Sequence, residues 1–195
     1  MKKIIMLLGI VFCFILCADD AAEIKKVLLK EYQFFSQEDL KGCLQLYTTD
    51  YISCDDTGEV SKYKDEKDNA IIHDGKHPVE FFIYLYELEN DGKKPSKEEI
   101  NQAKESIQSS DFRKEYQIFC LAAYTLMRRD GDVALKTIKF HNVYVSGDFA
   151  SVVYERKTID IEDETFKKTM SVWHSVTLKK IDGTWKITSD IIRKK

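Results

Sequence analysis

The stretch that decides the fold is residues 171–190, SVWHSVTLKKIDGTWKITSD. Apolar and polar residues alternate on both sides of Asp182-Gly183, a dipeptide that favours a two-residue turn between antiparallel strands. The pattern therefore predicts a β-hairpin. The same alternation fills the C-terminal third of the chain, with strands expected over 134–145, 149–161, 166–181 and 185–193 and turns at 146–148 and 162–164.

The turn also predicts the register of the hairpin. If only Asp182 and Gly183 lie in the loop, Leu178 faces Ile187, and further out Val176 faces Ser189 and His174 faces Ile191. His174 then shares the apolar inner face with Val172 and Met170, and with Phe166 beyond them. The same count turns Asp190 to the opposite face, so a His174–Asp190 pair is not expected without a bulge.

The chain before the strands has helical spacing. Residues 21–47 predict two helices, the second beginning near Ser36 and Asp39 with the Ser36 hydroxyl as its expected cap. The segment 78–92 is predicted to be a helix with Pro78 at its first position. Ser96 and Glu99 form a capping box for the next helix. A further helix is expected over 111–129, ended by Gly131, and the polar residues 61–77 are expected to be mostly loop.

The first 18 residues, MKKIIMLLGIVFCFILCA, have the pattern of a secretory signal. Two lysines precede an apolar span that is too short for a comfortable membrane helix. Cleavage after Ala18 predicts a secreted or periplasmic protein. The alternatives are a lipid anchor on Cys17 and an uncleaved anchor, and the membrane is expected as a partner if Cys17 is lipidated. Residues 19–195 are expected to form a single domain.

Charge and cysteine content narrow the function classes. The formal net charge of −3 becomes −5 when Lys2 and Lys3 are removed with the signal. Basic residues alternate with acidic ones, which disfavours nucleic-acid binding. Cys43, Cys54 and Cys120 remain in the mature chain. One pair could form a disulfide, but we expect all three to be buried as small apolar side chains.

Two further stretches carry a resemblance. Residues 33–59, QFFSQEDLKGCLQLYTTDYISCDDTGE, and the ending LKKIDGTWKI at 178–187 resemble the nuclear transport factor 2-like superfamily, which includes SnoaL-like domains. The resemblance implies an α+β fold in which a cone-shaped, curved antiparallel sheet wraps around N-terminal helices. Residues 61–110 depart from the family pattern as an inserted helical region. It implies no single activity, because members of the superfamily include enzymes, transport adaptors and proteins without a known reaction.

His174 is the residue that raises the question of catalysis. It is predicted either to be a hydrogen-bonded core histidine or to line a pocket at the wide end of the cone, where it could transfer a proton. An acid partner is not placed by the sequence. The candidate pocket-lining residues are His174, Met170, Val172, Phe119 and Tyr116.

Metal and cofactor sites have little support in the sequence. His73 and His77 have i, i+4 spacing, but Gly75 between them argues against the helix that such a metal pair needs. Nucleotide-binding and nucleophile motifs are absent from the sequence. We therefore expect no metal and no cofactor.

The outer face of the sheet is predicted to carry Trp173 opposite Ile192, an apolar pair suited to a homodimer contact. The preferred hypothesis is a secreted, non-catalytic SnoaL-like domain that binds a small apolar ligand or a protein partner. The alternatives are a small-molecule isomerase or lyase that uses His174, and a dimeric adaptor that uses the outer face.

Overall fold

The computed structural model describes residues 2–72, 78–90, 93–107, 110–163 and 165–195. The helices are α1 (Lys2–Ser36), α2 (Leu40–Leu44), α3 (Tyr63–Ile72), α4 (Pro78–Glu89), α5 (Lys97–Ser106) and α6 (Ser110–Thr137). The strands are β1 (Tyr47–Cys54), β2 (Val60–Lys62), β3 (Lys139–Ser146), β4 (Phe149–Ile159), β5 (Thr169–Ile181) and β6 (Thr184–Lys194). No helix among the described residues is long and apolar enough to cross a membrane.

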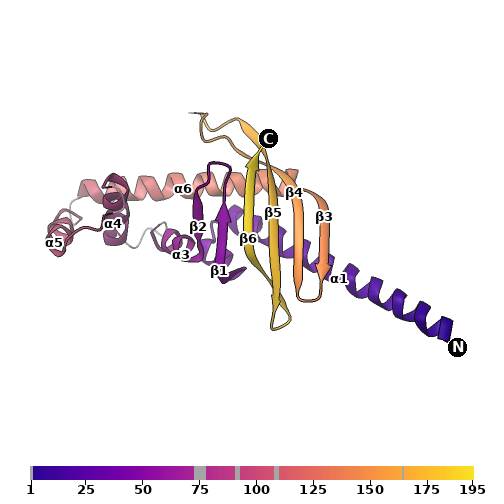
Figure 1. The fold of residues 1–195 in the computed structure, drawn as a ribbon. Coiled ribbons are helices and arrows are strands. Elements are labelled where there is room, and N and C mark those ends of the chain that lie inside the picture. The colour runs from indigo at the N-terminus through magenta and orange to yellow at the C-terminus, as the bar shows by residue number, and fades with distance from the viewer. Residues whose placement is uncertain (1, 73–77, 91–92, 108–109, 164) are drawn as a thin grey trace.

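The six strands form one curved sheet in the order β2-β1-β6-β5-β4-β3. The predicted meander over β3 to β6 is antiparallel. In addition β1 pairs with β6 in parallel, so the sheet is mixed. The helices α1 and α6 pass behind this sheet in Figure 1, while α4 and α5 lie together at the end away from β3. The fold is α+β, as predicted.

The main core lies between α1 and the inner face of the sheet. Ile24, Leu28 and Tyr32 recur at helical spacing on α1 and are buried against strand residues that alternate inward. The inward set on the strands includes Val152, Tyr154, Val176, Leu178, Trp185 and Ile187. Burial of these side chains is the main driving force for the packing of the two layers.

Gly131 does not end a helix, contrary to the prediction. Helix α6 continues through it to Thr137, so the strand expected from residue 134 begins only at Lys139. A Cβ atom at position 131 would lie 2.5 Å from the Ser36 backbone nitrogen and 2.7 Å from the Tyr32 carbonyl oxygen. Glycine therefore allows α6 to pack directly on the last turn of α1, a role that the local sequence does not reveal.

Several local predictions are confirmed. Pro78 begins α4, and the Ser96–Glu99 capping box is complete at the start of α5. Asp182 and Gly183 both have positive φ, 50° and 77°, as a tight two-residue hairpin turn requires.

Other local predictions are wrong. Residues 61–72 form the end of β2 and all of α3 rather than a loop. His73 and His77 lie outside the described residues. Asp39, not Ser36, caps α2, because its carboxylate accepts the Gly42 N–H at 2.8 Å. Phe166 lies in the loop before β5, not in the inward row.

Cys43 and Cys120 are buried, as expected, whereas Cys54 is half-buried at the end of β1. All three are free thiols.

Candidate functional site

The register of β6 is the largest departure from the predicted site. Leu178 pairs with Ile187 as expected, but the adjacent Thr177 pairs with Ser189, so Thr188 is an extra residue in β6. A bulge of this kind reverses the alternation beyond it. His174 therefore faces Ile192, and Val176 faces Asp190.

Because of the bulge, Asp190 points inward and bonds to His174. The Nδ1–Oδ2 distance is 2.8 Å, and the two residues are 2% and 8% exposed. The prediction that Asp190 lies on the opposite face was therefore wrong. Asp190 is the acid partner of His174 that sequence reasoning missed. It was missed because the bulge was not predicted. The residues around it, Ile187-Thr188-Ser189, include no glycine or proline that would indicate a bulge.

Arg156 forms a hydrogen bond with the other ring nitrogen of His174. Its Nε–H donates to His174 Nε2 at 3.1 Å. Since the guanidinium can only donate, Nε2 must be the acceptor, and Nδ1 then carries the proton that is donated to Asp190. His174 is thus a neutral imidazole with both ring nitrogens engaged.

The network continues from β4 to the helical layer. Arg156 Nη1 donates to Asp130 Oδ2 on α6 at 3.0 Å, and Asp130 also accepts bonds from the Thr158 hydroxyl and the Ile159 N–H. The chain Asp130–Arg156–His174–Asp190 therefore links α6, β4, β5 and β6. Oδ1 of Asp190 is buried and has no hydrogen-bond partner among the described residues.

Aromatic rings enclose the imidazole. Tyr154 stacks on His174 with centroids 4.7 Å apart and planes at 5°, and its hydroxyl bonds to the Tyr32 hydroxyl at 2.7 Å. The Arg156 guanidinium lies 4.8 Å from the Tyr32 ring centroid. The position next to His174 is therefore filled by side chains.

A second buried acid lies on α1. Glu31 is 7% exposed and accepts a hydrogen bond of 2.5 Å from the Tyr47 hydroxyl. The pKa of Glu31 is raised to about 7, mainly by burial and in smaller part by the charge of Asp190, although the Tyr47 hydrogen bond lowers it. Near neutral pH this carboxyl can therefore hold a proton inside the core.

The predicted pocket-lining residues do not meet at one place. Val172 is buried beside His174 on β5, and Met170 is partly buried at the start of that strand. Tyr116 lies in a separate cluster on α6, where it packs on Phe81 of α4. Phe119 also contacts Phe81 but is 36% exposed.

The outer-face prediction is half right. Trp173 does lie on the outer face, where it stacks on His141 at 4.5 Å. Its cross-strand partner is Arg193 rather than Ile192, because the bulge places Ile192 in the row of His174. Ile191 takes the outer position instead and is 44% exposed.

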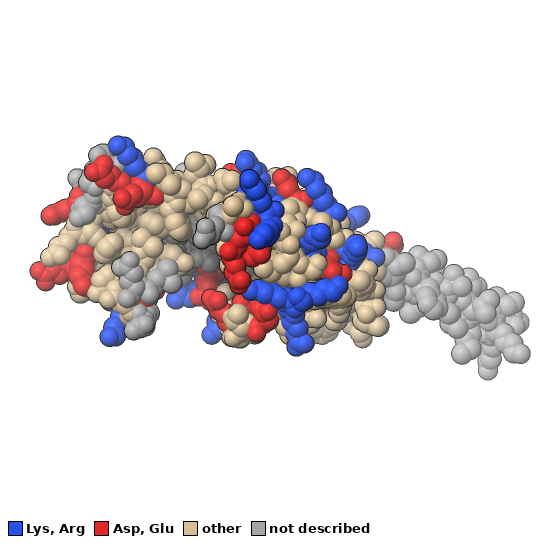
Figure 2. Space-filling model, turned by 90° about the horizontal axis from the view of Figure 1, so that it is seen from above, with Lys and Arg blue, Asp and Glu red and all other residues tan. Residues whose placement is uncertain are grey.

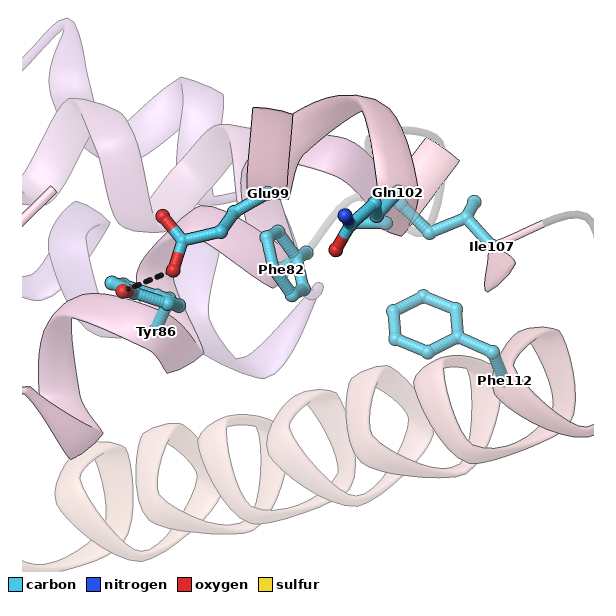
Figure 3. A pocket seen from close by; sticks show the side chains of 7 residues that line it. Phe82, Tyr86, Glu99, Gln102, Ile107 and Phe112 are labelled. Carbon is cyan, nitrogen blue, oxygen red and sulfur yellow. Dashed lines mark hydrogen bonds between the residues drawn. The ribbon is translucent and has the colours of Figure 1, made fainter. Parts of the chain in front are cut away.

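Two cavities lie among the helices, each lined by described residues that do not include His174. One, of about 370 Å³, lies between α4, α5 and the start of α6 and is lined by Phe82, Tyr86, Glu99, Gln102, Ala103, Ile107 and Phe112 (Figure 3). The other, of about 360 Å³, is lined by Phe35, Leu40, Glu66, Tyr84, Ala123, Tyr124 and Met127. We call them the α4–α5 pocket and the Glu66 pocket.

Among the described residues, no cluster of three or more His, Cys, Asp or Glu side chains could hold a metal ion. On the face in Figure 2, basic and acidic side chains lie side by side rather than in stripes of one sign.

The arrangement defines a class: α+β proteins with helices packed on one face of a curved sheet. No family model matches the sequence, and no curated protein matches it either. Solved structures do match. The chain is similar to a nuclear transport factor 2-like protein with a cystatin-like fold from Novosphingobium aromaticivorans, with a TM-score of 0.52 and 11% identity over 96% of this chain and 89% of that one. The chain therefore has the nuclear transport factor 2-like fold, as the resemblance predicted.

Two other similar structures show lower scores. A protein of unknown function from Shewanella oneidensis has a TM-score of 0.45 and 17% identity, over 88% of this chain and 97% of that one. A ketosteroid isomerase-like protein from Erwinia carotovora atroseptica has a TM-score of 0.46 and 12% identity, over 90% and 95%.

Proposed function

We propose that this protein binds a small apolar ligand without transforming it, and that the ligand occupies the α4–α5 pocket. The observation that carries the proposal is the engagement of both His174 ring nitrogens inside the core, 2% exposed. A general acid or base must reach the substrate proton. His174 offers neither a free lone pair nor a free proton, so binding is favoured over acid–base catalysis.

The walls of the α4–α5 pocket suit an apolar ligand. In Figure 3, the rings of Phe82 on α4 and Phe112 on α6 lie on two sides of the pocket, and Ile107 lies above the Phe112 ring. The volume of about 370 Å³ lies at the lower end of the range for small-molecule sites.

The acid at the rim of this pocket is already satisfied. Glu99 Oε1 accepts the Tyr86 hydroxyl at 2.7 Å, and Oε2 accepts the Ser96 N–H at 2.7 Å. Both oxygens therefore stabilise the fold, and apart from the amide of Gln102 the remaining wall is aromatic and aliphatic. A neutral, largely apolar molecule fits this surface better than a charged one.

The test is a fluorescence titration with the neutral dye Nile red. The substitution Ala103→Leu fills the α4–α5 pocket and is expected to weaken dye binding about tenfold, a loss of about 1.4 kcal/mol. The matched control is Ala123→Leu, which makes the same change in the Glu66 pocket and should leave the affinity unchanged. Equal affinity in wild type and Ala103→Leu, at unchanged melting temperature, would contradict the proposal.

Export of the chain belongs to the same proposal. Asp20 accepts hydrogen bonds from Lys180 Nζ at 2.7 Å and Trp185 Nε1 at 3.2 Å. Cleavage after Ala18 would retain this link between the N-terminus and the β5–β6 hairpin. Mass spectrometry of the mature N-terminus tests the cleavage and distinguishes it from lipidation of Cys17.

A dimer through the outer sheet face is a second candidate role. Val60, Ile52 and Ile191 are 51%, 45% and 44% exposed. They lie close together, because Cys54 on β1 pairs with Val60 on one side and with Ile191 on the other. Exposed apolar groups on neighbouring strands favour association. Light scattering over a range of concentrations tests it, and Ile191→Glu should abolish any dimer.

A further inference from the structure

The Glu66 pocket differs from the α4–α5 pocket in the state of its acid. Glu66 on α3 has neither a hydrogen-bond partner nor an ion-pair partner among the described residues. It is half-buried, and burial raises its pKa, with a further contribution from the neighbouring Asp65. Partial burial of a carboxylate without a nearby cation is unfavourable, and a positively charged ligand would offset this cost.

Aromatic side chains complete the surroundings of this acid. Phe35 at the end of α1, Tyr84 on α4 and Tyr124 on α6 line the same cavity. The faces of aromatic rings attract cations, and cages of such rings beside an acid recognise alkylated ammonium groups. Leu40, Ala123 and Met127 supply apolar surface for methyl or methylene groups.

We propose that the Glu66 pocket binds an organic ammonium ion, with the cationic head beside the Glu66 carboxylate and its alkyl groups against Phe35, Tyr84 and Tyr124. The cavity of about 360 Å³ has room for a quaternary ammonium head with a short chain. This site is separate from the α4–α5 pocket, so it goes beyond the apolar ligand proposed above.

The two helical pockets thus select for opposite ligands. In the α4–α5 pocket the glutamate is saturated by Tyr86 and the Ser96 backbone. In the Glu66 pocket the glutamate is left for the ligand. The discriminating group is the carboxylate, so a charge-neutral isostere of the same shape should bind poorly.

The probe is choline, compared with its neutral carbon isostere 3,3-dimethylbutan-1-ol. Binding is followed by methyl NMR of the full chain labelled at methionine. Met127 lines the pocket, whereas Met170 lies on β5 and provides an internal control. We expect choline to shift the Met127 methyl signal and leave that of Met170 in place, and the alcohol to bind at least about tenfold more weakly.

The variant Glu66→Gln keeps the shape of the side chain and removes its charge. It should weaken choline binding at least about tenfold. Glu98→Gln, the same change at an exposed site on α5, should have no effect. Equal binding of choline and the alcohol, an unchanged affinity in Glu66→Gln, or no shift of Met127 would each overturn the inference. Because the Nile red titration uses another probe and another pocket, the two proposals fail independently.

Discussion

The sheet body and the helical region handle buried polar groups in opposite ways. In the body, Arg156 and His174 are buried, and each of their bonds ends on another protein group. In the helical region, Glu66 is left without a partner among the described residues, and both cavities open between helices rather than strands. The His174 network therefore stabilises the body, although Oδ1 of Asp190 has no partner among the described residues. In the helical region Glu99 is also satisfied, so it is Glu66 that we propose for recognition.

Residue type alone would assign the opposite roles to the two regions. A histidine, an aspartate and an arginine in the cone suggest catalysis, whereas the region rich in phenylalanine and tyrosine resembles ordinary core. The hydrogen-bond partners favour the reverse assignment of roles. A polar group whose hydrogen bonds are all made within the protein stabilises the fold, whereas a group without partners is available to a ligand.

The largest effect is expected from Arg156→Ala. The substitution removes the donor that joins Asp130 to His174 and leaves the Asp130 carboxylate, whose side chain is 20% exposed, without its cation. Breaking a fully buried charge pair costs about 3–5 kcal/mol, so a loss of about 3 kcal/mol is expected for this partly buried pair. The free energy of unfolding, measured by urea denaturation, should fall by that amount.

Arg128→Ala is the matched control for this experiment. Arg128 lies on the same helical layer and pairs with Glu38 at 3.2 Å, but its side chain is 52% exposed. An exposed pair contributes about 1 kcal/mol or less. Equal losses for the two variants would mean that the network adds nothing beyond surface pairing.

A smaller, pH-dependent effect is expected at Glu31. Its pKa rises from 4.5 in the unfolded chain to about 7 in the fold, because burial penalises the charged form. The folded protein therefore holds a proton that the unfolded chain releases, so this contribution to stability is complete below pH 4.5 and is lost as pH rises through 7.

Glu31→Gln removes this titration. Relative to wild type, the variant should gain stability on the order of 2 kcal/mol between pH 5 and pH 8. Unfolding free energies at the two pH values measure the gain. Glu23→Gln makes the same change at an exposed position of α1 and should show no such difference. A pH-independent difference between wild type and Glu31→Gln would show that Glu31 titrates normally.

The sequence predicted those features that depend on local pattern. Pro78, the Ser96–Glu99 capping box and the Asp182-Gly183 turn each determine backbone geometry through nearby atoms, and all three are confirmed. Gly131 was misread because its role depends on α1, almost a hundred residues earlier in the chain. Helix α3 was missed because its residues have no clear apolar stripe.

The site was predicted only in part, for a related reason. The inward direction of His174 follows from the alternation of side chains, which depends only on the position of the turn. The identity of its hydrogen-bond partners cannot be derived in this way. Asp190 reaches the inner face through one extra residue in β6, and Arg156 comes from the neighbouring strand β4. Cross-strand geometry of this kind is not encoded in the spacing of any one segment.

The bulge offers the smallest and most discriminating effect. Because Thr188 is the extra residue, deleting it should produce a regular hairpin in which Ser189 still faces Thr177 and Asp190 still points toward His174. The expected cost is about 1 kcal/mol, from the lost bond of the Thr188 hydroxyl to the Thr177 carbonyl.

Deleting Thr177 instead shortens β5 opposite the bulge and turns His174 outward, which should unfold the hairpin. Urea denaturation of the two deletion variants measures the difference. If β6 lacked the bulge, loss of Thr188 would reverse its inner face, and the two deletions would be equally damaging.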